Sequence, residues 1–129
     1  MPPNTSSLTP IYVIFSLPLV QLEIFSFSMR EVPPLVGDVL AKNNLTLEEI
    51  DLFVFHQANA FILKMLARKL RIYSEKVYNC MEYIGNTVSA SVPIALAKAS
   101  KEGKIKKGST VLVAAFGIGY SWSGTIIKY

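Results

Sequence analysis

The sequence lacks the features of a secreted, disulfide-bonded or membrane-spanning protein. It contains one cysteine, Cys80, so no internal disulfide can form. The apolar run at 11–20 is interrupted by Ser16 and Pro18 and is too short to span a bilayer. It also lacks the basic flank of a signal peptide, because Arg30 is the first basic residue. We therefore expect a cytoplasmic protein without a membrane segment.

Charged side chains and metal ligands are also sparse. Charged residues make up 17% of the 129 residues and hydrophobic residues 51%, which argues against a disordered chain and fits a buried α/β domain. The net charge of +4 is mild, and no basic stripe is interleaved with aromatic residues, so we expect no nucleic-acid partner. No zinc-type spacing of ligands occurs, and no metal site is expected.

The first third of the chain predicts an irregular start followed by a helix. Residues 1–10 are rich in Pro, Ser and Thr and are expected to be poorly ordered. Residues 11–27 are β-branched and aromatic and could form one or two strands. From Met29 to Asn43 the apolar spacing is helical, with Pro33 and Pro34 placed in the first turn.

The remainder predicts alternating strands and helices. Residues 51–56 are apolar on both faces, as in a parallel strand covered on both sides. The pattern continues with a helix over 58–70, a strand near 77–80, a helix capped by Thr87 or Ser89 and ending near Glu102, and two strands at 110–116 and 121–128 joined by a tight turn. This order predicts an α/β fold with a mixed sheet and flanking helices.

His56 is the first candidate for chemistry. It ends the buried strand and precedes a helix, at the edge where open α/β sheets place their sites. A histidine near a helix N-terminus tends to stay neutral and can polarise a carbonyl group by donating a hydrogen bond. An isolated histidine is more often a hydrogen-bonded core residue, so the surrounding motif Phe-His-Gln-Ala-Asn at 55–59 carries the argument.

Two further motifs contain small or amide side chains. In Gly-Asn-Thr at 85–87, the glycine allows a tight loop that can present the Asn86 amide as a donor. In Phe-Gly-Ile-Gly at 116–119, small residues allow backbone amides to approach a ligand closely. Alone, Gly-Asn-Thr is usually a plain turn, and Phe-Gly-Ile-Gly is a simple tight turn as often as it is a ligand-binding loop.

The third motif continues as Phe-Gly-Ile-Gly-Tyr-Ser-Trp over 116–122. Together, and in this order, the three motifs resemble the C-terminal part of a β-ketoacyl-acyl-carrier-protein synthase III, a condensing enzyme of the thiolase superfamily. The resemblance covers about residues 25–129, whereas residues 1–24 form a divergent or poorly ordered N-terminal segment. It implies the C-terminal half of a thiolase-like fold.

The resemblance also implies a reaction and a set of site residues. The reaction is the decarboxylative condensation of an acyl-coenzyme A with malonyl-acyl-carrier protein in fatty acid biosynthesis, with no permanently bound cofactor. His56 and Asn86 correspond to catalytic residues, and the backbone amide of Ile118 to an oxyanion-hole donor. Pantetheine or carrier-protein binding corresponds to Gln57, Ala58, Asn59, Ala60 and Phe61. Phe61 stands where many members of the family have arginine, which weakens ordinary carrier-protein docking. The full-length family implies a homodimer.

The nucleophilic cysteine of that family lies in an N-terminal half that this sequence does not contain. Cys80 is an unsuitable replacement, because Tyr78–Met81 predicts a strand without the glycine-flanked turn of a nucleophile. Three interpretations follow: an enzyme half that needs a cysteine-bearing partner half, a non-catalytic remnant or binding module, and a related condensing enzyme of secondary metabolism. The primer acyl chain is left undetermined.

Overall fold

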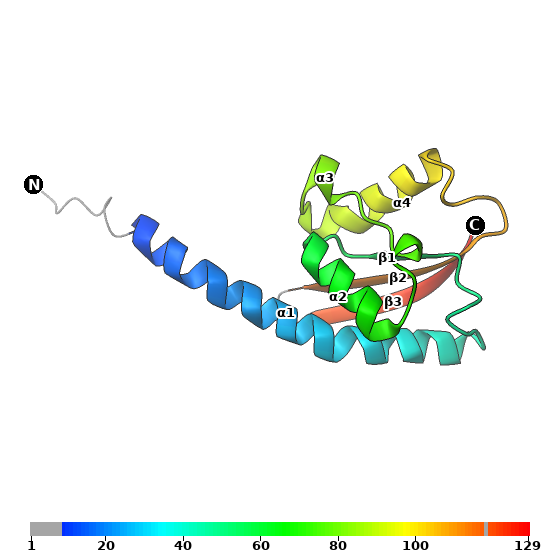
Figure 1. The fold of residues 1–129 in the computed structure, drawn as a ribbon, viewed down its shortest axis with the longest axis horizontal. Coiled ribbons are helices and arrows are strands. Elements are labelled where there is room, and N and C mark those ends of the chain that lie inside the picture. The colour runs from blue at the N-terminus through cyan, green and yellow to red at the C-terminus, as the bar shows by residue number, and fades with distance from the viewer. Residues whose placement is uncertain (1–8, 118) are drawn as a thin grey trace, which may run out of the picture.

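The protein is a mixed three-stranded sheet covered by helices on both faces, in a computed structural model that describes residues 9–117 and 119–129 (Figure 1). Strands follow the order β1-β2-β3, with β1 parallel to β2 and β2 antiparallel to β3. This arrangement confirms the predicted α/β fold class. The elements are α1 (Thr9–Lys42), β1 (Leu52–Phe55), α2 (Ala60–Leu70), η2 (Ser74–Lys76), α3 (Met81–Ile84), η3 (Val88–Ala90), α4 (Ser91–Lys101), β2 (Thr110–Gly117) and β3 (Ser121–Lys128).

Strand β1 is buried on both faces, as its sequence predicts. Phe53 and Phe55 point into a core shared with α1 and α2, whereas Leu52 and Val54 point into a second core shared with α4. Alternation along a strand sends successive side chains to opposite faces, so two layers of helix require an apolar residue at every position. The run of four apolar residues is therefore explained by the helical layers.

Helix α1 contradicts the prediction of strands within residues 11–27, because a single helix runs from Thr9 to Lys42. A continuous apolar run does not distinguish a buried strand from a buried helix by its pattern. Within this helix the packed residues Ile24, Phe27, Val32 and Val36 recur at helical spacing. In Figure 1 the N-terminal turns extend past the sheet. The division of the chain at residue 24 stays a prediction.

Pro33 and Pro34 lie inside α1 and not in the first turn of a helix, as the sequence had suggested. Pro33 has no N–H, so the carbonyl of Met29 loses its usual helical partner. The ammonium group of Lys69 in α2 donates to that carbonyl oxygen at 2.6 Å. This contact satisfies the free carbonyl and ties α2 to α1.

No helix in the described part of the chain combines the length and apolar character needed to cross a bilayer.

The predicted strand at 77–80 is wrong. Val77 makes an isolated parallel bridge with Phe53, and the N–H of Tyr78 donates to the carbonyl of Phe53 at 2.9 Å. Two residues further along, where a strand would again bond to its neighbour, the N–H of Cys80 donates instead to Oε1 of Gln57 at 3.0 Å. A side chain therefore takes the place of a strand partner, and the chain turns into α3.

The start of α4 also differs from its prediction. Neither Thr87 nor Ser89 acts as the cap; α4 begins at Ser91 after the short turn η3, and none of the described side chains caps it. Pro93 falls in the first turn, where its missing N–H costs little.

The close packing of β3 against α1 generates a stability prediction at Gly124. A methyl group there would meet the Val113 carbonyl oxygen and Cγ2 of Val39, both at 3.1 Å. We expect Gly124→Ala to lower the free energy of unfolding by about 1–3 kcal/mol, as overpacking typically does.

Gly37 is the matched control, since it is exposed within α1 and an added methyl meets nothing within 4 Å in the described structure. We expect Gly37→Ala to raise the free energy of unfolding by about 0.5–1 kcal/mol. Urea unfolding of both variants at one protein concentration measures the difference. Equal effects of the two substitutions would contradict the packing described here.

Candidate functional site

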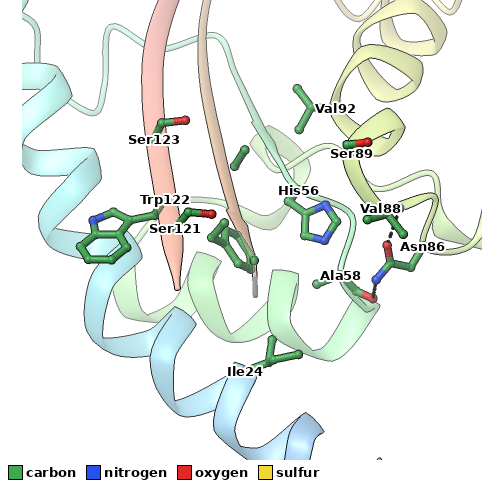
Figure 2. A pocket seen from close by; sticks show the side chains of 13 residues that line it. Ile24, His56, Ala58, Asn86, Val88, Ser89, Val92, Ser121, Trp122 and Ser123 are labelled. Atoms are coloured by element: carbon green, nitrogen blue, oxygen red, sulfur yellow. Dashed lines mark hydrogen bonds between the residues drawn. The ribbon is translucent and has the colours of Figure 1, made fainter. Parts of the chain in front are cut away.

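His56 and Asn86 line the same cavity, which has a volume of about 610 Å³. The cavity lies beside the ends of β1 and β2, where parallel strands place their ligand sites. In the view of Figure 2, His56 lies between the loop that carries Asn86 and the strand that carries Ser121 and Trp122. The lining residues are Ile24, His56, Ala58, Asn86, Val88, Ser89, Val92, Ala115, Phe116, Gly117, Ser121, Trp122 and Ser123.

The His56 ring is held on two sides. Its Nδ1 lies 2.5 Å from Oγ of Ser91, and its ring meets the ring of Phe116 edge-on with the centroids 5.5 Å apart. Burial lowers the pKa of His56, which favours the neutral ring at pH 7. Helix α2 begins at Ala60, so His56 precedes the first helical turn and burial is the physical cause of the shift.

The Asn86 side chain is fixed by two backbone contacts, drawn as dashed lines in Figure 2. Its Oδ1 accepts from the N–H of Val88 at 2.9 Å, and its Nδ2 donates to the carbonyl of Ala58 at 3.3 Å. An amide nitrogen carries two hydrogens, so one donor is still available to a molecule in the cavity. The second contact also joins the Asn86 loop to the loop after His56.

Backbone strain is present in this same loop. Val88 has φ of +54°, a left-handed conformation that a β-branched residue rarely adopts, and its side chain is 72% exposed at the cavity wall. Strained backbone of this kind persists where the surrounding structure imposes it, most often at functional sites. The N–H of this strained residue donates to Oδ1 of Asn86.

The other predicted binding residues, at 57–61, have different surroundings. Gln57 is fully buried, and its amide is hydrogen-bonded to backbone groups of Phe55, Tyr78 and Cys80. Asn59 caps α2, because its Oδ1 accepts from the N–H of Ile62 at 2.8 Å. Ala58 lines the cavity, whereas Ala60 and Phe61 are exposed at the start of α2. Binding of pantetheine by this segment stays a prediction.

The predicted oxyanion donor, Ile118, lies outside the described residues. Its neighbour Gly117 lines the cavity, and Gly119 has φ of +139°, which favours glycine. The role of the Ile118 amide therefore stays a prediction.

Sequence reasoning missed one buried contact of His56, the hydroxyl of Ser91. It also did not place Ser121, Trp122 and Ser123 at the cavity, although the motif Phe-Gly-Ile-Gly-Tyr-Ser-Trp at 116–122 contains the first two. Strand β3 is largely exposed in the described structure, so it has no alternation of apolar and polar residues that would mark the cavity-lining positions.

Chemically, the site offers neutral hydrogen-bond donors in a mostly apolar cavity. A neutral imidazole and a carboxamide can both donate to one carbonyl oxygen and stabilise negative charge that develops on it. Within residues 9–117 and 119–129, no three His, Cys, Asp or Glu side chains gather as a metal ion would require.

Comparisons with known proteins show which family this chain belongs to. Residues 40–129 match the family described as 3-oxoacyl-[acyl-carrier-protein] synthase III C terminal. A β-ketoacyl-[acyl-carrier-protein] synthase III of Campylobacter jejuni is 40% identical over 107 residues, which are 83% of this chain and 33% of that protein. The Aquifex aeolicus protein of the same name is 41% identical over 107 residues, 83% of this chain and 35% of its own length.

Solved structures of such proteins have the same fold. The Aquifex aeolicus 3-oxoacyl-[acyl-carrier-protein] synthase III superimposes with a TM-score of 0.82 at 40% identity, over 84% of this chain and 35% of that one. The Thermus thermophilus enzyme gives a TM-score of 0.80 at 36% identity, over 83% and 33% of the two chains. The chain spans about a third of the length of these relatives. It has the C-terminal half of a thiolase-like fold and belongs to the 3-oxoacyl-[acyl-carrier-protein] synthase III C-terminal family.

Proposed function

We propose that this chain is the C-terminal catalytic half of a 3-oxoacyl-[acyl-carrier-protein] synthase III. The observation that carries the proposal is the meeting of His56 and Asn86, from separate loops, at one mostly apolar cavity. The reaction is the decarboxylative condensation of acyl-coenzyme A with malonyl-acyl-carrier protein. The protein acts in the cytoplasm, in fatty acid biosynthesis, and no bound cofactor takes part.

In this mechanism His56 and Asn86 act on the malonyl thioester. As carbon dioxide leaves, negative charge develops on the thioester oxygen, and both side chains donate hydrogen bonds to it. The resulting enolate carbon attacks an acyl group held as a thioester on an enzyme cysteine, which departs as the thiolate. The backbone amide of Ile118 is the proposed donor to the oxyanion formed at that acyl carbon.

The nucleophilic cysteine comes from an N-terminal half, because Cys80 is unsuited to the task. Cys80 is buried, and its Sγ lies 3.6 Å from Oε1 of Gln57 as a donor. Burial raises the pKa of the Cys80 thiol, whereas a nucleophilic cysteine needs a lowered pKa. The complete enzyme would be a homodimer of chains that contain both halves.

Docking of the carrier protein is proposed at the exposed start of α2. Lys64 and Arg68 are exposed on this helix and could pair with an acidic carrier protein. Phe61, by contrast, is 60% exposed and stacks on Phe25 with ring centroids 5.6 Å apart. Phe61 in place of arginine favours the two other interpretations: a non-catalytic remnant or binding module, or a related condensing enzyme with a different acyl acceptor.

The burial of Cys80 predicts slow alkylation. Iodoacetamide should label Cys80 at pH 7 far more slowly in the folded chain than in urea, because the raised pKa leaves little thiolate and the sulfur is enclosed. Labelling should accelerate as the pH rises. Mass spectrometry over time measures both rates, and folded and urea-unfolded rates that agree at pH 7 would contradict the structural role of Cys80.

The proposed catalysis is tested by mixing this chain with the separately produced N-terminal part of the Aquifex aeolicus relative. Malonyl-dependent condensation should appear on mixing. His56→Ala and Asn86→Ala should each reduce the rate by about 10²–10³-fold, the usual loss for one such donor.

Two further variants sharpen this experiment. Asn86→Asp keeps an acceptor for the Val88 N–H but removes the amide donor, so it should lose activity as Asn86→Ala does. Gly37→Ala lies on the exposed surface of α1 and should leave the rate unchanged. A stable complex of the two halves without condensation would support the non-catalytic candidate.

If the chain normally pairs with an N-terminal half, we expect the isolated chain to associate with other copies of itself. Beside α4 lies an apolar hollow lined by Leu96, Ala97, Ser100, Ile105, Val111, Ile127 and Tyr129. Exposed apolar surfaces of this kind favour interfaces. Sedimentation of the isolated chain at tens of micromolar should show self-association that disappears when the N-terminal half is added. A sharp monomer peak without detergent would count against a missing partner.

A further inference from the structure

The hydroxyl of Ser91 contacts Nδ1 of the His56 ring. Ser91 is the first residue of α4 and is fully buried. Its Oγ lies 2.5 Å from Nδ1 of His56 and 3.2 Å from the backbone nitrogen of Gln57. One buried hydroxyl therefore contacts the strand end that carries the candidate catalytic ring.

The protons of this contact can be assigned by counting donors and acceptors. The Gln57 N–H can only donate, so the Ser91 oxygen accepts there. The hydroxyl has one proton of its own, and Nδ1 of His56 is the acceptor within reach in the described part of the chain. If Nδ1 carried the proton instead, the buried hydroxyl proton would lack an acceptor, which is costly.

We propose that Ser91 is a positioning residue that holds neutral His56 in the tautomer with its proton on Nε2. Nε2 is directed away from Ser91, and the ring as a whole lines the cavity. The tautomer therefore presents an N–H donor to a carbonyl oxygen, whereas the opposite tautomer would present a lone pair. The edge contact with Phe116 limits the ring orientations that could undo this arrangement. The catalytic consequence rests on the proposed function, but the tautomer itself does not.

The chain is suited to a direct test, because His56 is its single histidine. A long-range proton–nitrogen NMR correlation of the ¹⁵N-labelled chain at pH 8 distinguishes a protonated from an unprotonated ring nitrogen. We expect an unprotonated signal for Nδ1 and a protonated signal for Nε2 in the wild-type protein. A wild-type spectrum with the proton on Nδ1 would overturn the proposal without any variant.

Ser91→Ala should shift both nitrogen signals toward each other, as the two tautomers begin to exchange. Ser89→Ala is the matched control, since Ser89 lines the same cavity without a hydrogen bond to His56 in the described structure, and its spectrum should match wild type. Circular dichroism confirms that each variant is folded. An unchanged spectrum in folded Ser91→Ala would overturn the positioning role.

The mixing experiment separates this proposal from the proposed function. If wild type has the Nε2–H tautomer but the mixed halves do not condense substrate, the synthase function fails and the role of Ser91 in setting the tautomer stands. If the halves are active and Ser91→Ala loses its tautomer preference, the rate should fall by less than in His56→Ala. An active Ser91→Ala complex with the wild-type rate would overturn the catalytic importance of Ser91.

Discussion

The buried carboxamide of Gln57 is the interaction on which the site depends. Its Nε2 donates to the carbonyls of Phe55 at 2.9 Å and Tyr78 at 3.2 Å, and its Oε1 accepts from the N–H of Cys80 at 3.0 Å. Its own backbone N–H donates to Ser91. The end of β1, the segment before α3 and the start of α4 thus meet at one residue. An apolar side chain here would leave several buried backbone groups unsatisfied, which is costly.

Around this junction, each candidate catalytic group is held by contacts from another part of the chain. His56 is hydrogen-bonded to Ser91 of α4, and Asn86 donates a hydrogen bond to the carbonyl of Ala58 in the loop after β1. Val88, which has a left-handed backbone, donates its N–H to Oδ1 of Asn86. Donors that are oriented before a substrate binds need no reorganisation as charge develops, which is the physical basis of this type of catalysis. In the proposed reaction, these hydrogen bonds therefore hold both donors in position for the substrate.

The accuracy of the sequence-based predictions depended on how local their physical signal was. The parallel strand before His56 and the hairpin of β2 and β3 were predicted correctly, because apolar runs and turn residues act over a few positions. Helix α1 was mistaken for strands over part of its length, since its apolar run fits either structure and Pro33 suggested a helix start. The free Met29 carbonyl that such a proline creates is satisfied by Lys69, which is distant in the sequence. The strand near Cys80 failed for a similar reason, a side-chain partner from Gln57.

By itself, the sequence determined the family and most of the order of helices and strands, because motifs and periodicity are local properties. The same motifs singled out His56 and Asn86 as candidate site residues. Only the tertiary structure decided which of the hydroxyl residues after Asn86 meets the imidazole. Ser91 and His56 are 35 positions apart, and Ser89 has the same chemistry two residues earlier. Which side chain turns inward follows from where α4 begins and how it packs on the sheet. That packing is a property of the whole fold, and it is what fixes the direction of each donor at the cavity.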